Sequence, residues 1–110
     1  MVPSYPVTVL EYLDPGGHNP YADWFDELNA PAAAKVVIGL TRLAQGNYSN
    51  VKAVGAGLME CKIDFGPGYR IYFGKDGERL VILLGGGIKR RQQSDIRIAQ
   101  MRWSDYKKRK

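Results

Sequence analysis

The spacing of apolar residues changes in the middle of the chain, and this change limits the folds open to it. Between residues 19 and 46, apolar side chains recur at helical spacing, over residues 20–28 and 31–44. From residue 58 they alternate as in strands, with glycine-containing turns at residues 66–68 and 75–78. Because helical and strand patterns are segregated along the chain, we expect an α+β fold.

The expected elements follow the order β-α-α-β-β-β-α. A first strand covers residues 5–13 and ends at an Asp-Pro-Gly-Gly breaker. Two helices follow, one capped at Asn19-Pro20 and one that restarts near Pro31 and stops at Gly46. We expect them to form an antiparallel hairpin on one face of the sheet. Residues 47–57 are small and polar and are expected to form a surface loop.

Three strands and a helix complete the expected fold. The strands cover residues 58–65, 69–74 and 80–84. The last strand is apolar on both faces, so we place it at the centre of a mostly antiparallel, twisted sheet. The triple glycine that follows is expected to end it. A final helix starts at residue 93 or 94 and runs into a basic tail at about residues 104–110.

Length and composition indicate a single domain over residues 1–110. No apolar run is long enough to span a bilayer, and residues 1–6 lack the features of a secretory signal. We therefore expect a soluble, cytoplasmic protein. Cys61 is the only cysteine, which excludes an internal disulfide and a CxxC metal site. We expect no metal and no cofactor, because potential ligands do not group at metal-binding spacing.

Charge is distributed unevenly between the two halves of the chain. The chain has a formal net charge of +5, but residues 1–57 carry 3 basic and 5 acidic side chains, a net of −2. The remainder carries 13 basic and 6 acidic side chains, a net of +7. This asymmetry predicts that the C-terminal half binds a polyanion or an acidic protein surface, or that it is an ordinary solvated basic face.

Strand alternation places a set of polar residues on one face of the hairpin formed by residues 58–74. The members of this set are Lys62, Asp64, Arg70 and Tyr72. The triple glycine after the last strand lets Lys89, Arg90 and Arg91 approach the rim of the same face. A basic concavity with aromatic groups is a reasonable RNA cleft, because cations hold phosphates and rings stack on unpaired bases.

RNA cleavage by 2′-hydroxyl attack assigns roles to these residues. Arg70 suits stabilisation of the phosphorane, because a guanidinium grips two phosphate oxygens at once. Lys62 and Lys89 are candidates for phosphate binding or proton transfer, and Tyr72 is the fourth catalytic candidate. The residues expected to contact RNA outside the catalytic group are Asp64, Arg90, Arg91 and Gln93.

Structural roles stay open for two of these residues. Tyr72 is also typical of a half-buried strand aromatic, and Arg70 could form a plain salt bridge with Asp64. His18 is the only histidine and lies in a loop far along the sequence from the other candidates. A histidine acid–base pair is therefore excluded.

Two segments resemble motifs of a known protein family. Residues 58–73, LMECKIDFGPGYRIYF, resemble a hairpin with the pattern E-x-K/R-I-x-Y/F-G-x-G-Y-R-V/I-Y-F. Residues 81–96, VILLGGGIKRRQQSDI, resemble the ending LL-x-GG-D/N-K-x-x-Q-x-x-DI. Residues 24–28 and 50–58 resemble the first half of the same family. The chain thus resembles, over roughly residues 5–105, the RelE/HigB superfamily, in the branch known as addiction module killer proteins.

The resemblance implies a RelE-like fold and a toxin of a type II toxin–antitoxin system. Such toxins are metal-independent endoribonucleases that cut messenger RNA in the decoding site of the ribosomal 30S subunit, formed by 16S rRNA. The implied partner is a small helix-turn-helix antitoxin that neutralises the toxin, and operator DNA is reached only through that antitoxin.

The chain differs from the family pattern near its second motif. Ile88 stands where an acidic residue is common, and Arg90-Arg91 replaces a small polar pair. No histidine or tyrosine lies between Lys89 and Arg102. Either the chemistry uses lysine, arginine and Tyr72, or this copy is a weakened toxin that serves mainly as an antitoxin or operator-complex partner. A ParE-like, non-enzymatic inhibitor of DNA gyrase is the other alternative.

Overall fold

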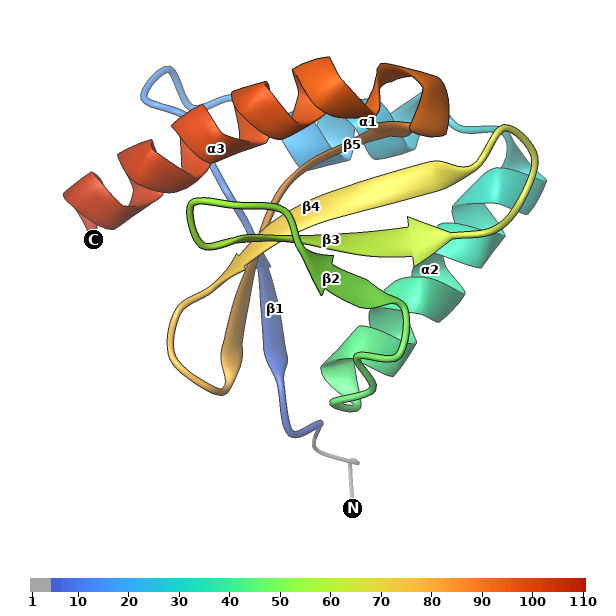
Figure 1. The fold of residues 1–110 in the computed structure, drawn as a ribbon, viewed down its shortest axis with the longest axis horizontal. Coiled ribbons are helices and arrows are strands. Elements are labelled where there is room, and N and C mark those ends of the chain that lie inside the picture. Colours follow the sequence, from blue (N-terminus) through green and yellow to red (C-terminus); the bar gives the residue numbers. More distant parts are fainter. Residues whose placement is uncertain (1–4) are drawn as a thin grey trace.

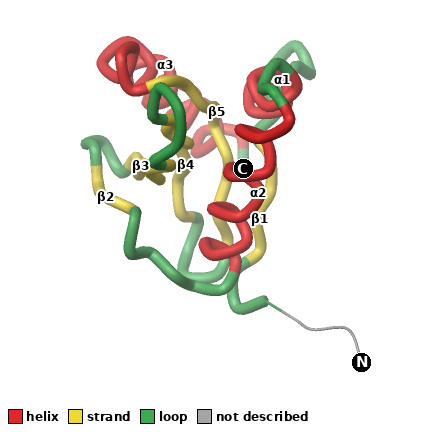
Figure 2. Tube along the Cα trace, turned by 90° about the vertical axis from the view of Figure 1, so that its right-hand side faces the viewer, coloured by secondary structure: helices red, strands yellow, loops and turns green. Residues whose placement is uncertain are grey.

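A five-stranded sheet separates two layers of helix in the computed structural model, which describes residues 5–110. The elements in chain order are β1 Thr8–Glu11, α1 Pro20–Asp26, α2 Ala30–Ala44, β2 Val51–Ala53, β3 Leu58–Ile63, β4 Tyr69–Lys75, β5 Leu80–Ile88, the 3-10 helix η1 Lys89–Arg91, and α3 Gln92–Arg109. The helices α1 and α2 cover one face of the sheet and α3 covers the other, as Figure 1 and Figure 2 show. The prediction of an α+β fold is confirmed.

The strands lie in the order β1-β5-β4-β3-β2. The ladders from β2 to β5 are antiparallel, whereas β1 runs parallel to β5, with Thr8 opposite Leu80. The sheet is therefore mixed, and mostly antiparallel as predicted. The apolar strand β5 lies inside the sheet between β1 and β4, and its residues 81–84 are buried. Its predicted burial on both faces is confirmed, although β4 is the middle strand.

The first strand, predicted over residues 5–13, is limited to Thr8–Glu11, and two larger differences from the prediction concern β2 and the end of β5. The segment 47–57, predicted as a loop, contains β2, whose Val51 lies opposite Cys61 of β3. This strand is too short to show an alternation in the sequence. The triple glycine does not end β5, because the β4 ladder continues beyond it and pairs Tyr69 with Ile88. The hydrogen bonds between strands come from the backbone, so glycines can continue a strand. They are found in strands where another group approaches the backbone closely.

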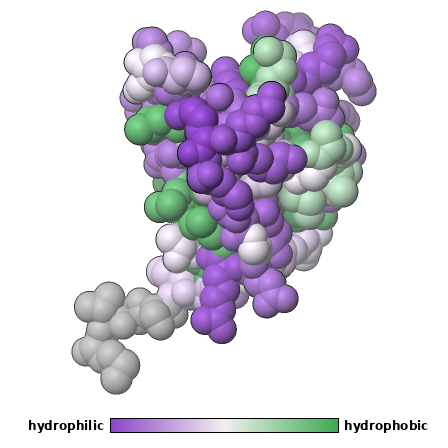
Figure 3. Space-filling model, turned by 90° about the vertical axis from the view of Figure 1, so that its left-hand side faces the viewer, coloured by the Kyte–Doolittle hydropathy of each residue, from purple (hydrophilic) through white to green (hydrophobic). Residues whose placement is uncertain are grey.

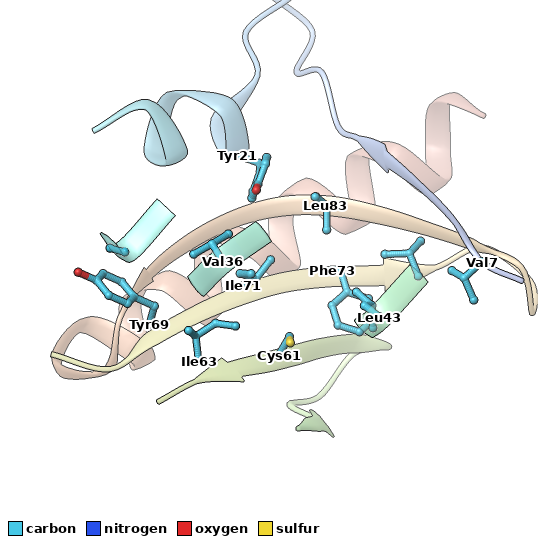
Figure 4. Packing of buried hydrophobic residues seen from close by; sticks show 12 residues of the cluster. Val7, Tyr21, Val36, Leu43, Cys61, Ile63, Tyr69, Ile71, Phe73 and Leu83 are labelled. Atoms are coloured by element: carbon cyan, nitrogen blue, oxygen red, sulfur yellow. The ribbon is translucent and has the colours of Figure 1, made fainter. Parts of the chain in front are cut away.

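Polar caps start both helices of the first layer. The side chain of Asn19 accepts a hydrogen bond from the Ala22 amide at 2.9 Å, and Asn29 accepts one from Ala32 at 2.9 Å. The predicted antiparallel helix hairpin is not observed, because α1 packs mainly on β5 and α2 packs on β3. The two helices share one core, shown in Figure 4, with apolar residues of β3, β4 and β5.

The second core lies under α3. It combines Tyr12, Leu58, Tyr72, Ile82, Leu84, Ala99 and Trp103. The indole of Trp103 lies so close to Gly74 that any side chain there would overlap it. Aromatic and aliphatic packing therefore fixes α3 across the sheet.

The segment predicted as a basic tail is the last part of α3 and is held in place. Arg109 donates a hydrogen bond to the Leu13 carbonyl at 2.6 Å, and the Lys110 ammonium lies 2.7 Å from the Asp76 carboxylate. Figure 3 shows that this face of the molecule is predominantly hydrophilic. The helical pattern continues because Trp103 and Tyr106 pack on the sheet side, which the run of lysines conceals in the sequence.

Among residues 5–110, none of the helices combines the length and the apolar character needed to cross a bilayer. The absence of a secretory signal was predicted from residues 1–6, of which residues 1–4 lie outside the described part of the chain. Cys61 is buried in the first core.

Candidate functional site

The three cations predicted as catalytic, Lys62, Arg70 and Lys89, meet at one end of the sheet. Lys62 of β3 lies directly opposite Arg70 of β4, and Arg70 lies opposite Gly87 of β5. The Lys89 amide donates a hydrogen bond to the Gly68 carbonyl at 2.8 Å. A methyl group at Gly68 would lie 3.3 Å from Cβ of Lys89 and 3.6 Å from Nη1 of Arg70. Residues separated by up to 27 positions in the sequence thus form one cluster, as the strand pattern predicted.

Arg70 is buried, which contradicts the prediction that it lies on an exposed surface. Only 6% of the residue is exposed, and its Nε lies 3.1 Å from Oε1 of Glu60. The Nε–H does not point at the carboxylate, so the contact is an ion pair without a hydrogen bond. Nη1 donates a hydrogen bond to the Tyr69 carbonyl at 3.0 Å. The predicted alternative partner Asp64 instead pairs with Lys62, at 3.4 Å.

Glu60 is a site residue that the sequence analysis missed. It is 1% exposed and lies opposite Tyr72 in the β3–β4 ladder. Gln92, at the start of α3, donates a hydrogen bond to Oε2 of Glu60 at 2.6 Å. Alternation places Glu60 on the same face as Lys62, but a strand pattern does not reveal that α3 covers this part of the face. The Glu60 carboxylate holds the Arg70 guanidinium in place and compensates its charge.

Tyr72 lies on the predicted face but inside the protein. The residue is 1% exposed, and its hydroxyl has no hydrogen-bond partner among residues 5–110. Burial, together with the nearby carboxylates of Glu60 and Asp95, raises the pKa of Tyr72 above its ordinary value. The prediction that its side chain lines an open cleft is wrong, because Ala99 and Trp103 of α3 pack against the same core.

The remaining predicted RNA-contacting residues are exposed. Arg90 and Arg91 follow Lys89 in η1, and Gln93 lies in the first turn of α3. The Asp64 side chain is 77% exposed, next to the half-exposed Lys62. At this end of α3, the polar contact to the buried network comes from Gln92, the neighbour of the predicted Gln93. All the predicted cations except Arg70 are therefore accessible to a polyanion.

No protein-family model matches the chain. A protein of Haemophilus influenzae, described as uncharacterized, is 40% identical over 82 residues, which cover 74% of this chain and 83% of that protein. The chain belongs to the family of this H. influenzae protein. The relative's description states no activity, so family membership leaves the function to be argued from the site itself.

A hollow of about 230 Å³ in the protein borders the cation cluster. It lies between α2 and β3, and its lining includes Lys62 together with Lys35 and Arg42 of α2. The two cations of α2 were missed because the first half of the chain has a net negative charge. The fold brings them to the basic end of the sheet, where they extend the positive surface beyond Lys62.

Among residues 5–110 of the protein, no group of three or more histidine, cysteine or acidic side chains is arranged to hold a metal ion. His18 is exposed beside Asp14, whose pKa is lowered by the hydrogen bond from the His18 amide and by a second one from Gly16. This pair lies in the loop between β1 and α1. The charged groups that the cluster offers to an anion are those of Lys62, Lys89 and Arg70.

Proposed function

We propose that the protein is the toxin of a type II toxin–antitoxin system and cleaves messenger RNA on the ribosome. The observation that supports this proposal best is the meeting of Lys62, Arg70 and Lys89, from three separate segments, at one end of the sheet. Cations in this arrangement bind a phosphodiester and stabilise the negative charge of a phosphorane. The motif resemblance to the RelE/HigB superfamily supports the same proposal.

The proposed cleavage is an attack of the RNA 2′-hydroxyl on the adjacent phosphorus. The O2′–P bond forms, the P–O5′ bond breaks, and the products are a 2′,3′-cyclic phosphate and a 5′-hydroxyl. Lys62 and Lys89 bind the phosphate from two sides. The proton of the 2′-hydroxyl passes to solvent water, a lysine ammonium beside O5′ supplies the proton to the leaving group, and the neutral lysine regains a proton from water. Arg90 and Arg91 bind parts of the RNA other than the reacting phosphate.

Arg70 acts from the buried side of the cluster. Its Nε faces Glu60 and its Nη1 binds the Tyr69 carbonyl, and Nη2 makes no hydrogen bond within the described residues. Nη2 is thus the guanidinium atom open to a phosphate oxygen. Because the group is already fixed by Glu60, its orientation costs little rearrangement when the phosphorane forms.

The proposed partners follow from the same function. They are messenger RNA in the 30S decoding site and a helix-turn-helix antitoxin encoded by a neighbouring gene, with operator DNA bound only through the antitoxin. The proposed place of action is the cytoplasm.

Expression of the chain in bacteria tests this proposal. Expression alone should arrest growth, and co-expression of the neighbouring antitoxin gene should restore it. Growth arrest with intact messages and loss of DNA supercoiling would favour the gyrase inhibitor instead. Normal growth at confirmed soluble expression would contradict an active toxin and favour the weakened copy.

A further inference from the structure

A second hollow, of about 200 Å³, lies at the free edge of β5 between α1 and α3. The register of β1 with β5 ends at Leu83, so β5 residues 85–87 have no strand on that side within the described chain. Trp24 of α1 forms one wall, and Asp95 and Arg102 of α3 form the other.

The triple glycine makes room for these walls. A methyl group at Gly85 would lie 2.8 Å from Nη1 of Arg102, a methyl at Gly86 would overlap the Trp24 indole, and a methyl at Gly87 would overlap the Asp95 carboxylate. Any other residue at these positions would push the walls away or fill the hollow. The glycines thus have a role that is distinct from ending the strand.

Three side chains at this hollow, those of Tyr72, Asp95 and Arg102, have hydrogen-bonding atoms without a partner within residues 5–110. The Tyr72 hydroxyl is buried without a partner, and the partly exposed side chain of Asp95 forms no hydrogen bond or ion pair within residues 5–110. Burial raises the pKa of Asp95, although Arg91 and Arg102 act in the opposite direction. Arg102 uses Nη1 to bind the Leu84 carbonyl at 3.0 Å, which leaves its other N–H groups available. The partly exposed carboxylate of Asp95 and the remaining N–H groups of Arg102 are therefore available to a ligand in the hollow.

We propose that this hollow binds one unpaired guanine base of the RNA. Guanine is the common base whose edge carries two adjacent N–H donors, N1–H and N2–H, which fit the two oxygens of Asp95. Its O6 and N7 acceptors fit the guanidinium of Arg102. The carboxylate and the guanidinium cancel in charge, so the hollow suits a neutral planar group in preference to a phosphate.

The position of the hollow agrees with a base next to the cleaved phosphate. Asp95 packs on Gly87, the register partner of Arg70, and Tyr72 is two residues from Arg70 on the same face. An RNA strand whose phosphate contacts the cation cluster would therefore bring a neighbouring base to Trp24 and Asp95. This placement rests on the proposed function, whereas the binding of guanine can be measured without it.

The test is an NMR titration of the intact protein with the four nucleoside monophosphates GMP, AMP, CMP and UMP. GMP should shift the Trp24 indole signal and the amides around Gly86, and should bind at least tenfold more tightly than the other three. Asp95→Asn and Arg102→Lys should each weaken GMP binding at least tenfold. The control Arg97→Ala removes an exposed charge from the same helix and should leave binding unchanged.

Equal binding of all four nucleotides, or GMP shifts confined to the Lys62 and Lys89 region, would overturn the guanine site. If the variants unfold, the relative affinities of the parent protein for the four nucleotides decide whether the guanine site exists. GMP binding at Trp24 by a protein that leaves messages intact would support the guanine site and contradict the cleavage proposal. Cleavage of messages by a protein that does not bind GMP would contradict the guanine site and support the cleavage proposal.

Discussion

At the scale of single residues, the buried pair of Arg70 and Glu60 dominates the candidate site. Two opposite charges with exposures of 6% and 1% lie on facing strands. A buried arginine that loses its carboxylate is left uncompensated in a medium that solvates charge poorly. We therefore treat Glu60 as a positioning residue for Arg70.

Glu60→Ala should lower the free energy of unfolding by about 3–5 kcal/mol, the usual cost of breaking a buried ion pair. Lys62→Ala is the matched control, since Lys62 is half-exposed on the same strand face and should cost about 0.5 kcal/mol. Urea unfolding of both variants checks the prediction. Equal stability of the two would show that the pair contributes nothing to folding.

The residues of the site could be predicted only in part. Alternation put Lys62, Arg70 and Tyr72 on one face correctly, because side chains of a strand alternate with period 2. The same rule cannot say whether that face is open. Arg70 is part of the interior, because it contacts Glu60 and because α3 forms a layer over this face.

At the scale of elements, the sequence predicted the three α-helices and the long strands, but neither the 3-10 helix η1 nor the point where the sheet ends. Capping asparagines and prolines are local signals, so the starts of α1 and α2 could be recognised. The extension of β5 through its glycines depends on Trp24, Asp95 and Arg102, which come from distant segments. Contacts between segments that are distant in the sequence cannot be recognised from the local sequence pattern.

The C-terminal part of α3 is anchored by two carboxylates, and their pKa values predict a pH dependence. Lys110 and Tyr106 lower the pKa of Asp76, and Arg109 and Tyr12 lower the pKa of Asp105. A carboxyl with a lowered pKa in the folded state stabilises the fold above its ordinary pKa of 3.8 and loses this contribution as pH falls below it.

The melting temperature of the parent should therefore fall as the pH drops below about 4, the ordinary pKa of an aspartate. The double variant Asp76→Asn, Asp105→Asn should melt lower at neutral pH and lose part of this dependence. Thermal melts across the pH range measure both effects. An acid-induced decrease of the same size in parent and variant would contradict the anchoring role.

At the scale of the whole molecule, the basic end of the sheet predicts a strong salt dependence of RNA binding. Residues 58–110 carry a net charge of +7, and the fold adds Lys35 and Arg42 beside Lys62. Each phosphate contact releases counterions, so the logarithm of the binding constant should fall linearly with the logarithm of the salt concentration.

Fluorescence anisotropy with a labelled single-stranded RNA measures this slope. Lys35→Ala combined with Arg42→Ala should reduce the slope by about 1–2, as expected for the loss of up to two phosphate contacts. A binding constant that does not change with salt would mean that the basic face is only solvated.

Primer extension on a message translated in vitro measures whether the cation cluster cleaves RNA. Lys62→Ala and Lys89→Ala should each slow cleavage by roughly a hundredfold, the usual loss on removing one group that stabilises the transition state. Lys108→Ala also removes an exposed lysine, far from the cluster in the last turn of α3, and should cut at the parent rate. If both cluster variants cut messages as fast as the parent, the cations at the end of the sheet are not the site of cleavage.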